Sequence, residues 1–215
     1  MKKKFTVILG GTFDPIHLGH LQVARFAFND LHADVGWLMP CGQHADKDPS
    51  QVSFIKHRKN MIDFALKDLD HWLLQDIELC NPNKSYTLDT LKALHQVCPD
   101  HQFAYLMGQD VMQSIENWDD WQEIIDYCHV VIVNRGCIPL AESVPVAWEN
   151  RLTSDWQALH KQDSGLLYLL HMPTHEASAT FVRNHMDHQD QNDQDVVDML
   201  QPEVMRYIKE HKLFT

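Results

Sequence analysis

The sequence predicts an α/β fold in which helices cover both faces of a doubly wound, mostly parallel sheet, with a small helical extension at the C-terminus. Short continuous apolar runs alternate with segments of helical spacing over most of the chain, which is the pattern of strands joined by crossover helices. The runs lack polar alternation, so we expect each strand to be buried on both faces. Residues able to bind anions directly follow several runs, and ligands of such sheets bind beyond the carboxyl ends of the strands.

The first half of the chain alternates between apolar runs and helical segments. The predicted strands lie at residues 5–9, 35–40 and 71–79. The predicted helices, in which apolar residues recur on one face, lie at residues 18–31 and 55–69. The stretch 41–53 is rich in Gly, Asp, Pro and Ser, so we expect a loop on the substrate side of the sheet rather than a helix or strand. Residues 81–84, Asn-Pro-Asn-Lys, predict a turn.

The second half continues the alternation. The predicted strands lie at residues 102–107, 129–134 and 166–172. The predicted helices lie at residues 87–97, 118–127 and 178–186. The segment 187–198 is acidic and rich in glutamine, which predicts a solvated loop or an exposed helix face.

Length and composition restrict the class of protein. The 215 residues suffice for one domain, which we expect to span 1–215. The net charge of −12 argues against binding of duplex nucleic acid, so a phosphate ligand would need a locally positive pocket. No apolar run is long enough to span a membrane, and the N-terminal Met-Lys-Lys-Lys leads into a strand without a cleavage-site pattern, so we expect a cytoplasmic protein. Five scattered cysteines without a C-x-x-C pair predict reduced thiols.

A glycine turn follows the first strand and precedes the first helix. Gly10 and Gly11 would let the backbone approach an anion, and the free N–H groups of the first helical turn would point at it. His17 and His20 stand three residues apart, so both imidazoles would project from the same face of the helix. Strand, glycines and histidines together predict a phosphate site at the start of the helix.

The run Gly-Thr-Phe-Asp-Pro-Ile-His-Leu-Gly-His at 11–20 resembles the signature of the His-x-Gly-His nucleotidyltransferases, and in its longer form that of bacterial nicotinate-nucleotide adenylyltransferases. The resemblance runs from about Lys4 to Phe214, where residues 204–214 resemble the closing helix of the family, and it is weakest near Lys47 and over 138–165. It implies catalytic roles for His17 and His20, with His20 stabilising charge on the α-phosphate or on the departing pyrophosphate. It further implies contacts with ATP from the signature residues Gly10, Gly11, Thr12, Phe13 and Gly19.

Two further segments resemble ATP-binding parts of the family, and one arginine is a candidate from its position after a strand. Residues 177–183 resemble its second ATP motif, which implies phosphate contacts from Ser178, Thr180 and Arg183; the alternative is an ordinary helix cap with a surface arginine. Gly108 and Asp110 resemble the family's Gly-x-Asp, which implies a contact with the ribose. Arg135 follows a predicted strand and would contact the nucleotide or a phosphate, or else form a surface ion pair.

The acceptor side is indicated by residues 85–91, which resemble the family's Ser-Tyr-Thr stretch. The resemblance implies that the backbone of Tyr86 and Thr87 binds the nicotinate carboxylate of nicotinate mononucleotide, that Trp118 stacks on the pyridine, and that Asp14 also contributes. The alternative is that Thr87 caps a helix and Trp118 belongs to the core.

The loop after the second strand departs from the family pattern. Relatives carry Pro-His-Lys there, whereas this chain has His44-Ala45-Asp46-Lys47. Either His44 or Lys47 can align, and Lys47 is the predicted third catalytic residue, with Arg58 as a further candidate cation. His185 and His188 repeat the spacing of the first histidine pair without a glycine turn, so we interpret them as surface residues. No cluster of histidines predicts a metal site.

The predicted activity is therefore transfer of the adenylyl group of ATP to nicotinate mononucleotide, with Mg²⁺ carried on ATP. Three alternatives stay open. A related nucleotidyltransferase would use nicotinamide mononucleotide, phosphopantetheine or, with CTP, a glycerol phosphate; a sensor would bind nucleotide without turnover; and a metal-binding module would use the histidines. The sequence does not predict an oligomeric state.

Overall fold

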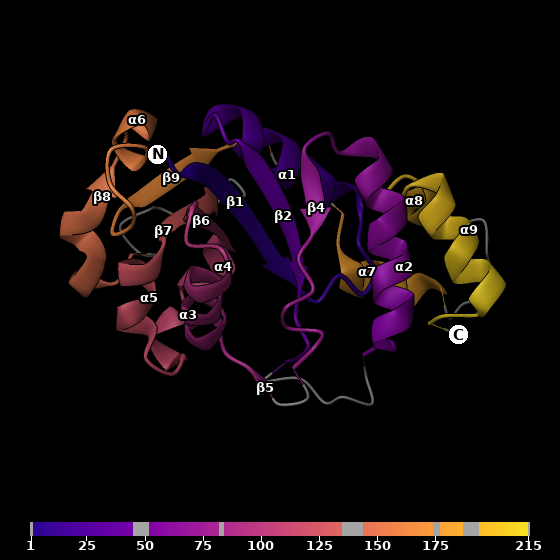
Figure 1. Ribbon diagram of the computed structural model, residues 1–215. Helices are drawn as coiled ribbons and strands as arrows, with labels where there is room; N and C mark the ends of the chain where they lie inside the picture. Colours follow the sequence, from indigo (N-terminus) through magenta and orange to yellow (C-terminus); the bar gives the residue numbers. More distant parts are fainter. Residues whose placement is uncertain are drawn as a thin grey trace.

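The computed structural model is built on a seven-stranded sheet in the strand order β4-β2-β1-β6-β7-β9-β8 (Figure 1). The structure describes residues 2–44, 52–81, 84–134, 144–173, 177–186 and 194–214. Every pair of neighbouring strands in this sheet is parallel. The strands are β1 (Lys4–Gly11), β2 (Val35–Pro40), β4 (Trp72–Leu74), β6 (His101–Gly108), β7 (His129–Asn134), β8 (Leu152–Thr153) and β9 (Leu167–His171). The predicted doubly wound parallel sheet is confirmed.

The strand order reverses at the centre of the sheet. From β1 the chain winds outward through β2 to the edge strand β4, then returns to β6 on the other side of β1 and continues to β7 and β9. Ile8 pairs with Tyr105 and Leu9 with Leu106, so the carboxyl ends of β1 and β6 lie side by side. Loops leaving this switch point diverge, which opens a crevice at that edge of the sheet.

Helices cover both faces, as predicted. The α-helices are α1 (Leu18–Asp30), α2 (Ile55–Ala65), α3 (Thr87–Val97), α4 (Gln109–Met112), α5 (Trp121–Tyr127), α6 (Trp156–Leu159), α7 (Ala179–Met186), α8 (Gln194–Val197) and α9 (Pro202–His211). Along β1, Phe5, Val7 and Leu9 pack in the core under α1, α2 and α9, whereas Ile8 packs in the core under α3 and α5. Both sets are almost fully buried because the sheet has no solvent face.

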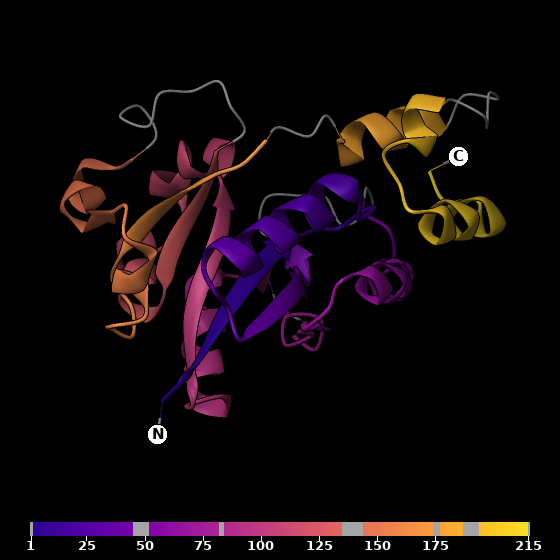
Figure 2. The same cartoon turned by 90° about the horizontal axis from the view of Figure 1, so that it is seen from above.

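The C-terminal helices form the predicted extension, beside α2 (Figure 2). The hydroxyl of Tyr207 on α9 lies 2.9 Å from Nδ1 of His57 and accepts a hydrogen bond of 2.7 Å from the Asn60 amide, which holds α9 against α2. In the part of the chain that the structure describes, no helix is both long and apolar enough to cross a membrane. The four cysteines among these residues are free thiols, as expected.

Four sequence predictions of elements need correction. The strand predicted at 71–79 ends at Leu74, because the Gln75 side chain accepts the Ile77 N–H at 3.2 Å and starts a turn. The helix predicted at 118–127 begins at Trp121, after the 3₁₀ helix η3 (Ile115–Asn117). Inside the loop predicted at 41–53, β3 (Gln43–His44) pairs with β5 (Lys84–Ser85), which also occupies part of the predicted turn. Two further 3₁₀ helices among the described residues are η2 (Leu66–Asp68) and η5 (Val146–Arg151). The elements η5, β8 and α6 lie in a region for which the sequence predicted no helix or strand.

A buried histidine supports the edge of the sheet opposite the crevice. His129 is fully buried; its Nδ1 accepts the Leu166 N–H at 3.2 Å, and its Nε2 donates to the Gln162 carbonyl at 3.0 Å. Both nitrogens are thus used by the neutral ring, and a proton on Nδ1 would face an N–H group. Burial accordingly lowers the pKa of His129.

This histidine predicts an acid-sensitive contribution to stability. The pKa of His129 in the folded state lies below its value of about 6.5 in the unfolded chain. The unfolded chain therefore takes up a proton first as the pH falls, so the contribution is present above that value and is lost as the pH drops toward the folded pKa. We expect the difference in free energy of unfolding between wild type and His129→Gln to shrink from pH 7.5 to pH 5 in urea titrations. A difference that does not depend on pH would contradict this assignment.

Candidate active site

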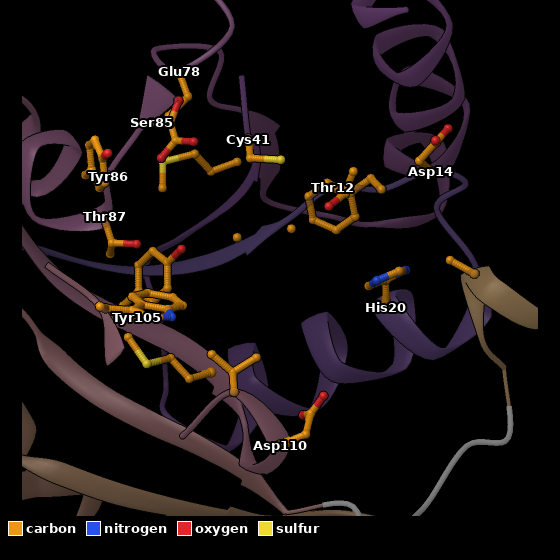
Figure 3. A pocket seen from close by; sticks show the side chains of 18 of the residues that line it. Thr12, Asp14, His20, Cys41, Glu78, Ser85, Tyr86, Thr87, Tyr105 and Asp110 are labelled. Carbon is orange, nitrogen blue, oxygen red and sulfur yellow. The ribbon is translucent and has the colours of Figure 1, made fainter. Parts of the chain in front are cut away.

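A pocket of about 440 Å³ opens at the switch point between β1 and β6. Its wall includes the end of β1 and the following loop, the starts of α3 and α7, and the segment around Trp118. Figure 3 shows Tyr86 and Thr87 at one end of the pocket and His20 at the other. Segments 169 residues apart meet here, since Asp14 and Arg183 both line the pocket. A pocket thus lies at the carboxyl edge of the sheet, where the sequence predicts the site.

The glycine turn is shaped by a tyrosine from the neighbouring strand. A methyl group at Gly10 would overlap the Tyr105 hydroxyl and would lie 2.9 Å from its Cζ. Tyr105 is buried, which raises the pKa of its hydroxyl, and it hydrogen-bonds with the Thr87 side chain. The next loop residue, Phe13, is buried with a left-handed φ of 49°, a conformation that is costly for a bulky residue. The backbone thus passes close to the pocket because packed aromatic rings hold it there.

Replacing Gly10 with alanine is expected to lower the free energy of unfolding by about 1–3 kcal/mol, because the new methyl group overpacks against Tyr105. Gly108→Ala is the matched control: its methyl group would meet only the carboxylate of Asp110, which is exposed and can rotate away. Removing the hydroxyl with Tyr105→Phe should recover part of the loss in the double variant. Equal melting temperatures for Gly10→Ala and Gly108→Ala would contradict the packing argument.

His17 and His20 have adjacent rings at different depths, but His17 does not belong to the helix as predicted: it is the N-cap that precedes α1, with an extended backbone (φ −143°, ψ 170°). Their rings stack with centroids 3.7 Å apart, and His20 lines the pocket while His17 is buried outside the lining. Gly19 is buried beside this pair, and a methyl group there would come within 3.1 Å of the His17 ring. Direct contact of His17 or Gly19 with phosphate stays a prediction. In the structure the His17 ring packs against His20, and Gly19 leaves room for the His17 ring.

A hydrogen bond defines which atom His20 presents to the pocket. The backbone N–H of His17 donates to Nδ1 of His20 at 3.2 Å. Because Nδ1 accepts, the proton of the neutral ring lies on Nε2. The edge of Phe13 packs against the same ring with centroids 5.0 Å apart, which limits its rotation. His20 is therefore arranged as a fixed hydrogen-bond donor at the mouth of the glycine turn.

Arg183 joins α7 to the first loop. Its Nη1 donates to the Asp14 carbonyl at 2.7 Å and its Nη2 to the Thr180 hydroxyl at 3.2 Å, and all three residues line the pocket. Ser178 lies outside the lining; its Oγ accepts the Phe181 N–H at 3.4 Å, which matches the helix-cap alternative. A guanidinium held by two neutral acceptors keeps its charge available to an anion.

The end of the pocket around α3 carries aromatic groups and the start of a helix. Tyr86 is the N-cap of α3 and Thr87 its first residue, so their backbone lies at the positive end of the helix. Thr87 does not cap the helix through its side chain, contrary to the alternative reading, because its hydroxyl bonds with Tyr105. Trp118 is half-buried and lines the pocket as well as packing on the core. Trp118 therefore packs on the core, as the second reading has it, while its stacking on the pyridine stays a prediction.

Carboxyl groups outnumber cations among the described lining residues. Asp14, Glu78, Asp110 and Asp119 line the pocket, whereas Arg183 is the only Lys or Arg among the described lining residues. Gly108, predicted beside Asp110, ends β6 just outside the lining. Burial raises the pKa of Glu78, although hydrogen bonds from Thr90, Ser85 and the Gly42 backbone oppose the rise. The locally positive pocket expected from the sequence is not found in the part of the chain that the structure describes.

Some predicted residues are not placed in this pocket. Lys47 and Arg135 lie outside the described residues, as do the side chain of His44 and all of His188. Arg58 is described and is fully buried outside the lining. His185 lies on α7 away from the pocket, with its ring stacked on Phe181.

Several lining residues were not predicted, among them Met39, Glu78, Tyr105 and Met107. Three of them belong to β2 and β6, where every second side chain points to the α3 side. Because successive side chains of a strand point to opposite faces, these three residues could have been predicted once the crevice was known to lie on the α3 side. Glu78 was hidden by its assignment to a strand, because only the turn after β4 brings it to the pocket.

Comparison with known proteins gives one consistent family. The family model described as Cytidylyltransferase-like matches residues 8–185. A protein of Pseudoalteromonas atlantica that carries the name "Probable nicotinate-nucleotide adenylyltransferase" is 31% identical over 211 residues, covering 96% of this chain and 93% of the relative. A protein of the same name from Hydrogenovibrio crunogenus is 33% identical over 208 residues, covering 96% of each.

A solved structure shares the fold. The Plasmodium falciparum nicotinic acid mononucleotide adenylyltransferase complexed with NaAD matches with a TM-score of 0.76 and 22% identity, covering 98% of this chain and 97% of the other.

Proposed function

Since this chain belongs to the nicotinate-nucleotide adenylyltransferases of the cytidylyltransferase-like superfamily, we propose that its carboxyl-edge pocket transfers the adenylyl group of ATP to nicotinate mononucleotide, giving deamido-NAD and pyrophosphate. One observation carries the proposal. The glycine turn, the His20 imidazole and the Arg183 guanidinium share a single pocket with the Trp118 ring and the N-terminus of α3. The first set suits a triphosphate, and the second suits a planar ring that bears a carboxylate.

The main barrier that the pocket must lower is repulsion between phosphates. The attacking 5′-phosphate oxygen is already anionic at neutral pH, so the reaction needs no strong general base. Two unit charges about 4 Å apart repel by about 4 kcal/mol at an effective dielectric constant of 20. Donors fixed before the reaction reduce this repulsion without reorganising.

His20 and Arg183 supply such donors. Nε2–H of His20 would donate to a nonbridging oxygen of the α-phosphate, and Arg183 would hold the β- and γ-phosphates. The acceptor oxygen would then form a bond to the α-phosphorus as the bond from that phosphorus to the departing pyrophosphate breaks. Such in-line displacement needs no covalent intermediate. Gly10, Gly11, Thr12 and Phe13 would shape the turn around the triphosphate, and Asp110 would accept from ribose hydroxyls.

The acceptor end would select an acid. The first backbone N–H groups of α3 lie where Tyr86 and Thr87 line the pocket, and a helix N-terminus favours a negative charge over a neutral amide. Trp118 offers an indole face to the pyridinium. Asp14 was also predicted to contact nicotinate mononucleotide, but it lies near Arg183, at the end of the pocket away from Tyr86 and Thr87. It is buried, and its Oδ2 accepts the Ser53 N–H at 2.9 Å; its contact with the mononucleotide stays a prediction.

Mg²⁺ would enter with ATP. Among the residues that the structure describes, no group of three His, Cys, Asp or Glu side chains could hold a metal ion. The described part of the pocket lining nevertheless has more carboxylates than cationic side chains, which suits a bound cation. Asp110, two residues after the end of β6, is one of the exposed carboxylates. The ion would neutralise phosphate charge that the described cations leave uncompensated. The single domain over 1–215 and the cytoplasmic location remain predictions.

A substrate panel tests the proposed function. Purified protein with ATP and Mg²⁺ is assayed for pyrophosphate with nicotinate mononucleotide, nicotinamide mononucleotide, phosphopantetheine or no acceptor, and with CTP and glycerol phosphate. We expect pyrophosphate and deamido-NAD in equal amounts with the nicotinate acceptor, and a lower kcat/KM with the amide. Faster turnover of another acceptor would reassign the substrate, and nucleotide binding without turnover of any acceptor would indicate a sensor.

A further inference from the structure

We propose that Arg58, a buried residue outside the pocket lining, is a positioning residue that holds the two loops flanking the reacting phosphates. The inference rests on the proposed function for the location of those phosphates. Arg58 lies in the first turn of α2, and its side chain is 1% exposed. Among the described residues, no carboxylate lies within ion-pair distance of its guanidinium. A buried cation of this kind needs other acceptors.

Backbone carbonyls of two loops supply these acceptors. Nη1 of Arg58 donates to the carbonyl of Thr12 at 3.0 Å and to that of Cys41 at 2.8 Å. Nη2 lies 3.4 Å from the carbonyl of Gly42. Thr12 follows β1 and Cys41 follows β2, and both line the pocket. One guanidinium therefore binds both loops at the point where they leave the sheet.

The position of these bonds explains their importance. The registered pairing of β1 and β2 ends at Gly11 and Pro40, and one further hydrogen bond joins the Cys41 N–H to the Gly11 carbonyl at 2.9 Å. Beyond that bond the backbones of the two loops, as far as the structure describes them, are no longer paired with each other. Arg58 links them instead, because it donates to a carbonyl of each loop. A guanidinium can do this because its donors form a rigid fork, whereas a lysine ammonium is a single point.

Glu78 holds the same turn from the other side. The Gly42 backbone N–H donates to the Glu78 carboxyl group, which also accepts from the Thr90 hydroxyl at 2.9 Å. A methyl group at Gly42 would overlap the Glu78 carbonyl, so the turn has no spare room. The turn at Gly42 is thus fixed between a buried cation and a buried carboxyl group that do not touch each other.

The arrangement also has an electrostatic consequence. The carbonyls of Thr12 and Cys41 are directed at Arg58, so their negative ends are engaged by a cation instead of facing a bound anion. Without the guanidinium these oxygens could turn toward the phosphates and repel them. Arg58 would therefore act on the reaction through the shape and charge of the loops, without touching the substrate.

The test compares Arg58→Lys and Arg58→Met with Arg25→Met. Arg25 is the matched control because it is exposed on α1 and donates to a backbone carbonyl, that of Asp68 at 3.0 Å, away from the pocket. Two sets of quantities are measured on folded protein: amide hydrogen exchange over residues 10–14 and 41–42, and kcat and KM for ATP and nicotinate mononucleotide. If Arg58→Met does not fold, Arg58→Lys provides both readouts.

We expect faster exchange in both loops of the Arg58 variants and a fall in kcat of about 10-fold for lysine and about 100-fold for methionine, with smaller changes in KM. Arg25→Met should change neither quantity. Unchanged exchange in folded Arg58→Lys, or a loss of activity that only follows the loss of folded protein, would overturn the proposal. A wild-type protein without turnover would instead refute the proposed function, and the exchange data would still decide whether Arg58 holds the loops.

Discussion

Replacing His20 with alanine is expected to lower kcat by about 10²–10³-fold while the melting temperature changes little, because the variant loses a donor aimed at the developing charge. His20 is half-exposed at the pocket wall, so its ring contributes little to the core. The described hydrogen bond makes the prediction more specific. Since Nδ1 accepts from the His17 N–H, the catalytic donor is Nε2.

Two amide variants distinguish the ring nitrogens. The amide nitrogen of glutamine can occupy the place of Nε2, whereas that of asparagine is closer to the place of Nδ1. His20→Gln should therefore retain more activity than His20→Asn. His185→Ala is the matched control, since this histidine also packs against a phenylalanine ring but lies outside the pocket. A kcat of His20→Ala within threefold of wild type would remove His20 from the proposed role.

The second large effect is expected for Arg183→Ala, which should raise KM for ATP by about 10–100-fold, the range that corresponds to the loss of one charged hydrogen-bonding group. KM for nicotinate mononucleotide should change much less, because Arg183 lies at the end of the pocket that holds Asp14 and Thr180. Initial rates measured with each substrate varied in turn give both constants.

A control separates the charge of Arg183 from its position. Thr180→Val removes one acceptor of the guanidinium but leaves the cation and its bond to the Asp14 carbonyl in place. Its effect on KM for ATP should be below that of Arg183→Ala. If Arg183→Ala weakens only the binding of nicotinate mononucleotide, the triphosphate and the acceptor have been assigned to the wrong ends of the pocket.

The order of strands and helices could be predicted because each apolar run marks a buried strand, and the strands β2 and β7 occur with the predicted bounds. The three-residue spacing also indicated that the rings of His17 and His20 lie together, although His17 precedes α1 as its N-cap. Spacing does not give depth, however. Only the packing of Phe13 and the loop around the ring pair determines that His20 reaches the pocket and His17 does not.

Long-range contacts account for what the sequence did not predict. Gly10 was interpreted through backbone freedom, whereas its described constraint is the Tyr105 hydroxyl, which lies 95 positions later in the chain. Arg58 was considered as a cation for phosphate, but its donors are used by carbonyls of two loops. Neither the contact of Gly10 with Tyr105 nor the bonds of Arg58 to the two loops can be recognised from nearby residues in the sequence. Both depend on which strands are neighbours in the parallel sheet.

The central claim is that one pocket holds the triphosphate and the nicotinate ring at opposite ends. It is tested most directly by a crystal structure of the protein with a nonhydrolysable ATP analogue and nicotinate mononucleotide. The account predicts a phosphate oxygen within hydrogen-bond distance of His20 Nε2, Arg183 beside the outer phosphates, and the pyridine against Trp118 with its carboxylate at the start of α3. A nucleotide bound away from the Gly10–Gly11 turn, with the His20 ring contacting no phosphate, would contradict it.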